Sequence, residues 1–424
     1  MRIRDFRLLM LDSALQGLVM PIHFITLTFW ATAKYPDEKV LYPSLIVAIR
    51  GFGLLGMSLL GGAIADRMQR RRVLQICQVF MFVNTLVTGV VMVTMPLGDG
   101  TIFLVLGLVF LVAANMGIDA PARAASVAAV VPQEHMGSAI GINNIAIQMM
   151  FPIVVPLVGF FNGRFDPGYV FLGSLLAWVG IFPAIVSYRY AEKRTTAGPG
   201  APKRGVIGDI REGIRYIRRD VSIQAVVLIV IALQVIAMPG VGALGPVWMT
   251  DVLGLSKAQF GLIAMFFGLG AGLSSFFFAR MQKLTRRDPT LCFTFLGFVV
   301  GALIFSYSRF APLTAFSNLV LGFSMAGTLV TAATLVQYRV ADEMRGRVMA
   351  LFPLIQGMSL LAVLPVGAAG QAYGLELVVP TMSWLALAAG GAVILARPSL
   401  RRAAGEQQSA AKPVPGVALA SEDR

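Results

Sequence analysis

Several apolar stretches of this sequence carry polar or ionisable side chains at helical spacing. Polar groups are costly in hydrocarbon unless they face protein or water. The pattern therefore predicts polar helix faces that either bond one helix to another or line a cavity where a solute or a proton binds. These side chains lie at i, i+4 and i+11 in one stretch and as i, i+4 pairs in two others, which places each set on one helix face: Asp12, Gln16 and His23; Asn115 and Asp119; Asn144 and Gln148.

One arginine, Arg50, stands alone inside an apolar stretch. It follows the predicted outer end of that stretch by ten positions, so it lies roughly 15 Å deep at 1.5 Å per residue. A central arginine costs about 2.5 kcal/mol or more to insert, and no acid is visible at a matching depth. Its side chain therefore either reaches a watery cavity or receives an anionic group. We hypothesise that Arg50 contacts the solute or its counter-ion.

Few other side chains in these stretches can titrate. Asp12, His23 and Asp119 can each carry a proton, and a histidine does so near neutral pH. They are the candidate proton carriers of the sequence.

The elements that must position these groups are membrane helices. Hydrophobic residues make up 57% of the 424 positions and charged residues 13%, whereas soluble domains carry about 25% charge. A stretch of about 20 apolar residues crosses roughly 30 Å of hydrocarbon as a helix. We therefore predict an all-α membrane protein with twelve spans, at 8–31, 41–63, 73–95, 101–122, 138–160, 168–189, 221–248, 259–279, 290–308, 312–338, 348–371 and 376–396.

The basic residues indicate how the spans are oriented. Of 35 lysines and arginines, 29 fall in the termini and the connections on one side, Arg123 among them, and 5 fall on the other side. Cytoplasmic loops carry this excess in membrane proteins. We predict both termini in the cytoplasm and a location in the plasma membrane. The net charge of +14 is then an orientation signal, and binding to nucleic acid is not expected.

The chain repeats itself at about half its length. Residues 131–137 align with 340–346 at an offset of 209, and Pro156 aligns with Pro365 at the same offset. Such matches favour a duplicated six-helix unit and hence two pseudo-symmetric bundles. We predict four parts: a bundle at 1–189, a cytoplasmic linker with a basic amphipathic helix at 190–220, a second bundle at 221–396, and a disordered tail at 397–424.

A short basic loop with one acid joins the second and third spans, Gly62-Ala63-Ile64-Ala65-Asp66-Arg67-Met68-Gln69-Arg70-Arg71-Arg72. It resembles the signature between helices 2 and 3 of the Major Facilitator Superfamily, with Gln69 in place of the second glycine. The loop could also serve only as a positive-inside anchor. The matching residues are Gly62, Asp66, Arg67, Arg70 and Arg71.

Three shorter motifs resemble the branch of that superfamily that contains enterobactin and macrolide exporters: Pro121-Ala122-Arg123, Val131-Pro132 and Arg345-Gly346-Arg347-Val348. The resemblance implies a secondary transporter that exports a small amphipathic molecule, such as a drug or siderophore, in exchange for protons. It also implies a central cavity lined by spans 1, 4, 7 and 10. Asp66 and its arginines would bond across to the start of span 11, near Arg345 and Arg347.

Two departures from the family pattern concern proton coupling. Ala113 stands where span 4 of the family carries its proton-linked arginine, and the antiporter motif of span 5 survives only as Pro156 and Gly159. An importer, a uniporter or a transport-dead receptor therefore remain alternatives.

The sequence carries no sign of an enzyme. It has no H-E-x-x-H, no G-x-S-x-G and no cluster of Cys and His, and no G-K-[ST] for a nucleotide phosphate. We expect no metal and no cofactor. The expected partners are a small molecule, protons and the lipid bilayer, and we expect the chain to act as a monomer.

Overall fold

The structure is a computed structural model that describes residues 3–67, 69–96, 98–131, 146–147, 149–187, 206–281 and 288–397, and every regular element in these ranges is helical. Ten helices are long and apolar enough to cross a membrane, and two shorter apolar helices, Leu41–Met57 and Met150–Arg164, complete the set. The predicted all-α membrane fold is confirmed. Of the predicted fifth span, residues 138–145 lie outside the described residues.

The first six spans form one bundle. Their helices are α1 (Ile3–Lys34), α2 (Leu41–Arg67), α3 (Arg70–Thr94), α4 (Asp99–Val130), α6 (Met150–Arg164) and a sixth span made of α7 (Pro167–Gly173), η3 (Ser174–Ala177) and α8 (Trp178–Ser187). A short turn of 3-10 helix, η1 (Pro36–Glu38), joins α1 to α2.

The second bundle begins with an irregular span. It runs from α10 (Val221–Ile231) through η4 (Ala232–Ala237), η5 (Pro239–Ala243), α11 (Gly245–Val247) and η6 (Trp248–Val252), and η4, η5 and η6 are π-helical. Pro239 and Pro246 interrupt the α-helical hydrogen bonds here, because proline has no N–H to donate. The remaining spans are regular: α12 (Lys257–Arg280), α14 (Asp288–Tyr307), α15 (Ala311–Arg339), α17 (Leu351–Tyr373), preceded by α16 (Asp342–Met349), and α18 (Leu375–Ala396).

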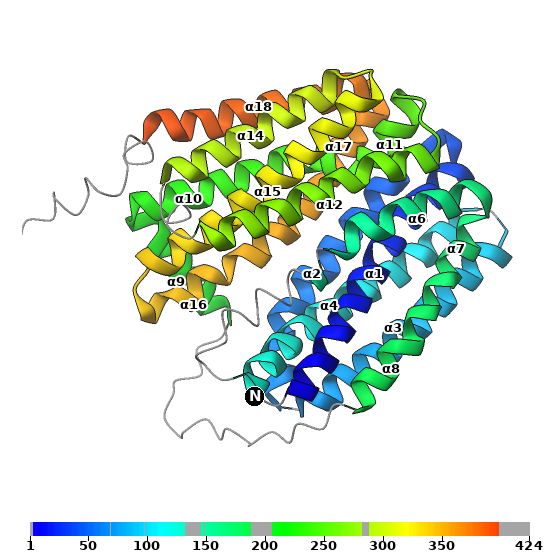
Figure 1. Cartoon of the computed structure of the whole chain (residues 1–424), viewed down its shortest axis with the longest axis horizontal. Helices are drawn as coiled ribbons and strands as arrows, with labels where there is room; N and C mark the ends of the chain where they lie inside the picture. Colours follow the sequence, from blue (N-terminus) through cyan, green and yellow to red (C-terminus); the bar gives the residue numbers. More distant parts are fainter. Residues whose placement is uncertain are drawn as a thin grey trace, which may run out of the picture.

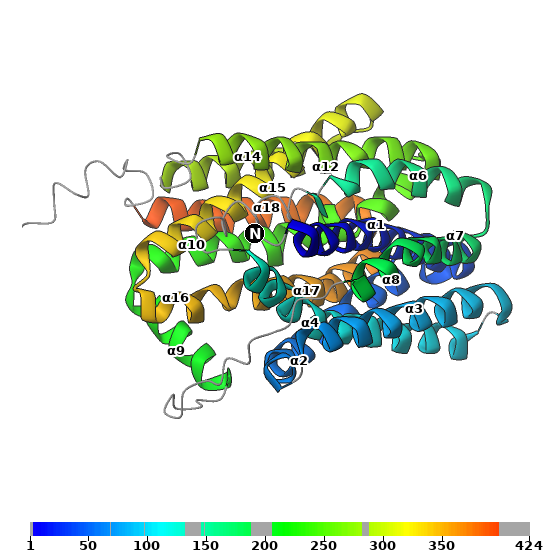
Figure 2. The ribbon, with the colours of Figure 1, turned by 60° about the horizontal axis from the view of Figure 1, so that its bottom comes forward.

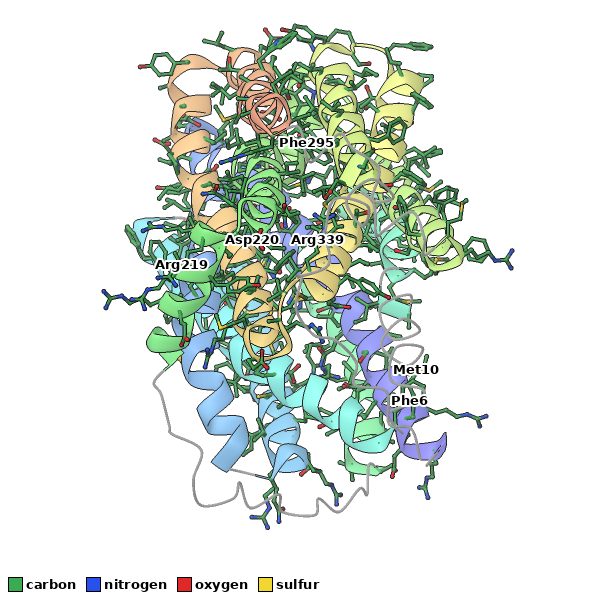
Figure 3. All side chains as sticks on the ribbon, turned by 90° about the vertical axis from the view of Figure 1, so that its left-hand side faces the viewer. Phe6, Met10, Arg219, Asp220, Phe295 and Arg339 are labelled. Atoms are coloured by element: carbon green, nitrogen blue, oxygen red, sulfur yellow. The ribbon has the colours of Figure 1, made fainter. Side chains whose placement is uncertain are left out.

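The two bundles lie side by side and converge toward one end (Figure 1). We call the end where α1 begins and α18 ends the terminal face, and the end with η1 and η6 the distal face. Figure 3 looks onto the terminal face, with Phe6 and Met10 of α1 in one bundle and Arg339 of α15 in the other.

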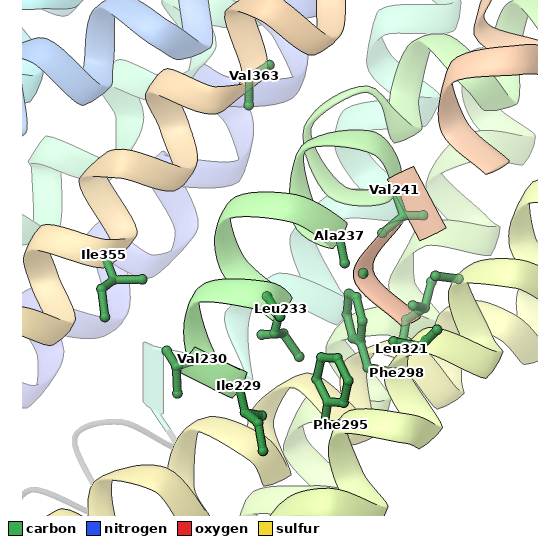
Figure 4. Close-up of a cluster of buried hydrophobic side chains, with 14 of the residues drawn as sticks. Ile229, Val230, Leu233, Ala237, Val241, Phe295, Phe298, Leu321, Ile355 and Val363 are labelled. Carbon is green, nitrogen blue, oxygen red and sulfur yellow. The ribbon is translucent and has the colours of Figure 1, made fainter. Parts of the chain in front are cut away.

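Large apolar side chains fill the second bundle around its irregular span. Phe295 and Phe298 of α14 lie against Leu233 and Ala237, and all four are almost fully buried (Figure 4). Leu321 of α15 closes this cluster from the other side. This core packs on one side of the π-helical segments, and their opposite side faces the first bundle.

Small residues let the bundles approach closely at two helix pairs, α6 with α12 and α2 with α17 (Figure 2). A methyl group on Gly261 of α12 would lie 2.8 Å from the carbonyl oxygen of Val155 and 3.0 Å from Cα of Pro156. One on Gly51 of α2 would lie 3.0 Å from the carbonyl oxygen of Gly357. At Gly261 the neighbouring atoms are backbone, so a larger residue could fit only if the helices separated, whereas Gly51 also lies against the Leu361 side chain.

The predicted amphipathic helix between the bundles is present as α9 (Val206–Arg219). Gly213 packs against Arg347 of α16, and Glu212 forms an ion pair of 3.0 Å with Arg347. The charged side of α9 faces outward, with Arg219 at the edge of the molecule (Figure 3). Residues 190–205, the tail beyond 397 and the repeated motif at 132–137 lie outside the described residues.

The close contact at Gly261 yields a stability prediction. In Gly261→Ala the added methyl group overpacks a backbone contact, which costs about 1–3 kcal/mol and outweighs the gain of up to about 1 kcal/mol in helix propensity. We expect a lower melting temperature, measured with a thiol-reactive dye that labels the buried free cysteines, Cys77 and Cys292, on unfolding.

Gly107 of α4 is the matched control, because nothing lies within 4 Å of a methyl group placed there. Gly107→Ala should leave the melting temperature unchanged or raise it. An equal response at both glycines would contradict the close contact.

Candidate functional site

A cavity of about 530 Å³ lies between the two bundles. Its wall in the first bundle comes from α1, α2 and α4, and α17 supplies Gln356 and Leu360 from the second bundle. Along α1 the lining runs from Ser13 to Phe24, which is roughly 16 Å at 1.5 Å per residue. The lining is mostly apolar, and its polar members include Gln16, Arg50, Arg123 and Gln356.

Arg123 binds two carboxylates in the cavity wall. Its Nε donates to Asp119 Oδ2 at 3.0 Å, one terminal nitrogen donates to Asp119 Oδ1 at 3.2 Å, and the other donates to Asp12 Oδ2. Asp12 is fully buried, and Asp119 and Arg123 are each 8% exposed. The cluster ties α1 to α4 through charge-assisted hydrogen bonds, which are the stronger kind.

This pairing corrects the predicted end of the fourth span. The sequence placed the end at residue 122 and Arg123 in a cytoplasmic connection, whereas α4 continues to Val130 with Arg123 buried. The helix can continue because Asp12 and Asp119 compensate the guanidinium charge and occupy its donors. A buried ion pair requires such compensation.

One oxygen of this cluster has no partner. Asp12 Oδ1 is buried and accepts no hydrogen bond from the described residues. Two carboxylates and one guanidinium carry one formal negative charge together, so the cluster has the capacity to accept one proton. It is therefore a chemically suitable proton site within a cavity wall.

Arg50 lies farther along the cavity and differs from Arg123 in its surroundings. It is 8% exposed, and its guanidinium carbon lies 5.9 Å from the centre of the Phe24 ring. Among the described residues no carboxylate pairs with it, as the sequence led us to expect. Within the described part of the chain, the Phe24 ring is the aromatic face that lies beside its positive charge.

A second chamber of about 230 Å³ continues the cavity toward the distal face. The two share four lining residues, Phe24, Val47, Phe151 and Leu360. The chamber is walled on one side by the π-helical span, from Met238 to Met249, and on another by Phe260 and Phe267 of α12. π-helical segments occur frequently at functional sites, and here they shape an aromatic, apolar space.

Contacts between the bundles close this chamber at the distal face. Phe29 of α1 meets Phe260 edge-to-face with ring centres 5.3 Å apart, and the Lys257 ammonium lies 5.3 Å from the centre of the Phe29 ring. Nearer the surface, Lys39 forms an ion pair of 2.7 Å with Asp251. Gln371 of α17 accepts from the Val40 N–H at 3.1 Å and donates to the Asp37 carbonyl at 2.6 Å.

Other predicted site residues lie away from the cavity. His23 shares a hydrogen bond of 3.1 Å with Ser174 and stacks on Phe171, so it holds α1 against the sixth span. Asn115 donates to the Cys77 carbonyl at 3.3 Å and joins α4 to α3. Both side chains therefore bond one helix to another, which was the alternative to lining a cavity that the sequence left open. Asn144 and Gln148 lie outside the described residues.

The gating residues are described only in part. Gly62, Asp66 and Arg67 belong to α2 and Arg70 to α3, but their side chains lie outside the described residues. Arg71 donates to the Val186 carbonyl of α8 at 2.8 Å. Arg345 and Arg347 lie on α16, where Arg347 pairs with Glu212. The proposed contact of Asp66 with these arginines therefore stays a prediction.

Three polar residues of the cavity lining were absent from the predicted site, Ser13, Arg123 and Gln356. Arg123 had a usable signal, because it stands at i+4 from Asp119 on the same helix face. Gln356 is a single amide in an apolar run, and nothing in its spacing distinguishes it. No group of three or more His, Cys, Asp or Glu side chains that could hold a metal occurs in the described ranges.

The sequence matches the family model of the Major Facilitator Superfamily at residues 8–362 and 227–419. This chain belongs to the Major Facilitator Superfamily. It is a multi-pass membrane transporter, and not an enzyme.

Solved structures with the same fold are similar along nearly the whole chain. A point mutant of the nucleoside transporter NupG has a TM-score of 0.73 at 12% identity over 92% of this chain and 99% of its own. A POT family transporter in complex with 5-aminolevulinic acid has a TM-score of 0.69 at 12% identity, covering 94% and 97%. The human organic anion transporter MFSD10 has a TM-score of 0.63 at 15% identity, covering 92% and 99%. A comparison with curated proteins gave no match.

At these identities the likeness shows the fold alone. The resemblance to the enterobactin and macrolide exporter branch is not confirmed by these structures, which include nucleoside and peptide transporters.

The Arg123 cluster yields a second prediction. Arg123→Gln leaves two buried carboxylates without their cation, which costs about 3–5 kcal/mol, so we expect a marked fall in the melting temperature. The double variant Arg123→Gln/Asp119→Asn removes one of the stranded charges and should melt above Arg123→Gln. Strictly additive effects in this double-mutant cycle would show that the two side chains do not interact.

Proposed function

We propose that this transporter moves a small amphipathic molecule by alternating access and couples the movement to protons. The observation that carries the proposal is the cavity between the bundles with the buried Asp12–Arg123–Asp119 cluster in its wall. A solute site at the interface of two repeats is where secondary transporters bind their cargo. The mixture of apolar lining with a few polar groups suits a molecule that is itself amphipathic.

Alternating access is supported by the kind of contact at the interface. The helices approach closely at Gly261, which lies against the backbone of α6, and at Gly51, which lies against the Gly357 carbonyl and the Leu361 side chain of α17. We infer that one bundle tilts on the other along these glycine-lined contacts. The distal contacts of Lys39 with Asp251 and of Phe29 with Phe260 are few and local. Breaking them would release the distal end of the cavity.

Proton coupling is assigned to the Asp12 carboxylate. Its Oδ1 accepts no hydrogen bond from the residues that the structure describes, and its Oδ2 accepts from Arg123. Protonation at Oδ1 would make the cluster electrically neutral, so the charge of the α1–α4 contact depends on the proton. This mechanism needs no arginine at position 113, where the family pattern would have one and where Ala113 lines the cavity.

The terminal face is proposed to be cytoplasmic, because the excess of lysine and arginine lies on that side and such an excess marks cytoplasmic loops. The protein would then lie in the plasma membrane with both termini inside. We propose export as the direction, on the short motifs shared with the exporter branch. Import is the alternative.

The first test of this function is Asp12→Asn in reconstituted vesicles with an imposed pH gradient, screened with dyes, macrolides and siderophores. The amide cannot gain or lose a proton in this range. We expect that gradient-driven accumulation of a transported compound is lost, whereas its exchange without a gradient stays within about twofold of wild type.

Asp166→Asn is the matched control, since Asp166 pairs with Lys34 at the distal surface, 3.4 Å away, and should behave as wild type. Full gradient-driven accumulation by Asp12→Asn would refute the assignment. Loss in both variants would show a general loss of function.

The second test locks the distal contact. Lys39→Cys/Asp251→Cys, in a Cys77→Ala/Cys292→Ala background, is cross-linked with a reducible bis-maleimide. We expect solute flux to fall about tenfold or more and to return on reduction, because a bundle that cannot open one side cannot alternate. Each single-cysteine variant, treated identically, should keep its flux. Undiminished flux through fully cross-linked protein would exclude alternating access through this opening.

A further inference from the structure

The cavity contains a cation whose partner is not supplied by the described part of the chain. Three other arginines show what pairing looks like here. Arg123 binds two aspartates, Arg339 binds Asp288 through two bonds of 2.8 and 2.7 Å, and Arg309 binds Glu376 at 3.2 Å. Arg50 is as buried as Arg123, yet no described carboxylate lies against it. Its guanidinium lines the cavity, and the Phe24 ring lies beside it.

The position of Arg50 within the cavity is also specific. Phe24, the ring beside Arg50, belongs to both the central cavity and the distal chamber. A group bound at the guanidinium is therefore next to the entrance of the aromatic chamber. Gln16 and Gln356 add amide groups to the lining of the central cavity, where they can donate to the oxygens of a polar head.

The second chamber, the distal chamber, has a mostly apolar lining, in contrast to the charged group at Arg50. Phe24, Phe151, Phe260 and Phe267 provide aromatic walls, and Phe151 and Phe267 have their ring centres 6.0 Å apart. Methionines Met238 and Met249 complete it with flexible apolar side chains. Such a space favours a flat apolar body, because aromatic rings offer large rigid contact areas and methionine adapts to irregular shapes.

From this arrangement we infer that the solute is an amphipathic organic anion, whose carboxylate or comparable acidic head binds Arg50 while its aromatic or alicyclic body occupies the distal chamber. The inference rests on the proposed transport function and narrows its substrate class. A cationic solute fits less well, since the acidic side chains that it would need, Asp12 and Asp119, are bound to Arg123. A guanidinium provides a planar pair of donors that matches a carboxylate.

The test uses three naphthalene compounds that share a ring and differ in the head: 2-naphthylacetate, 2-naphthylacetamide and 2-(2-naphthyl)ethylamine. Binding to the purified full-length protein in detergent is measured by calorimetry and by the shift in melting temperature. We expect the carboxylate to bind about tenfold or more tightly than the amide, and the ammonium compound to bind most weakly.

Substitutions at Arg50 assign the preference to this residue. In Arg50→Gln the preference for the carboxylate over the amide should fall to about threefold or less, and Arg50→Lys, which keeps the charge but loses the planar pair of donors, should give a preference between those of Arg50→Gln and the wild type. Arg164→Gln is the control, because Arg164 lies at the exposed end of α6 over Phe160 and away from the cavity. Phe151→Ala should weaken all three compounds by similar factors, since it alters the chamber that receives their common ring.

Equal binding of carboxylate and amide to the wild type, tightest binding of the ammonium compound, or a full preference in Arg50→Gln would each overturn the inference. Flux in vesicles separates this failure from failure of the proposed function. Flux of the amide or the amine that depends on Asp12, without flux of the carboxylate, would leave the function standing and remove the anion. Arg50-dependent binding of the carboxylate without flux of any compound would support the anion site and contradict the proposed transport function.

Discussion

The structure depends on how charge is compensated where water is scarce. A guanidinium in the hydrocarbon region is costly, and the fold compensates Arg123 with Asp12 and Asp119 from two helices. That compensation lets α4 continue through the level of the cavity, and it fixes α1 against α4. The same requirement makes Arg50 informative, because its charge has an aromatic ring beside it and no described carboxylate. Arg123 therefore joins two helices of the cavity wall. Arg50 is the arginine that we propose binds the solute.

The interface between the bundles combines two kinds of contact with different consequences. At Gly261 the α12 backbone approaches that of α6, against Val155. Side chains also join the bundles at the distal face, where Lys39 pairs with Asp251 and Phe29 meets Phe260. The irregular span from Ala232 to Val252 contains Asp251 and lines the distal chamber. Under the proposed function, solute binding and closure would therefore involve the same region.

The sequence proposed candidate site residues by helical spacing, and spacing could not say what each would contact. Asp12, Gln16 and His23 were placed on one face, yet Gln16 lines the cavity and His23 contacts Ser174, while Asn115 contacts the Cys77 carbonyl. Helical periodicity predicts which residues share a helix face, but it does not predict which helix that face contacts. Arg123 was assigned to a loop because an arginine after twenty apolar residues normally ends a span, and its two acids come from different helices.

The sequence alone determined the class of protein, the approximate spans and the presence of two bundles. The length of each apolar segment and the distribution of lysine and arginine are local properties, and they decide how a segment inserts into the bilayer. Tertiary structure decided which polar residues meet in the cavity, that Asp12 and Asp119 share one arginine, and that Phe24 separates a cationic from an aromatic space. These are relations between helices far apart in the chain. They depend on rotation and tilt, which packing sets after the spans are already defined.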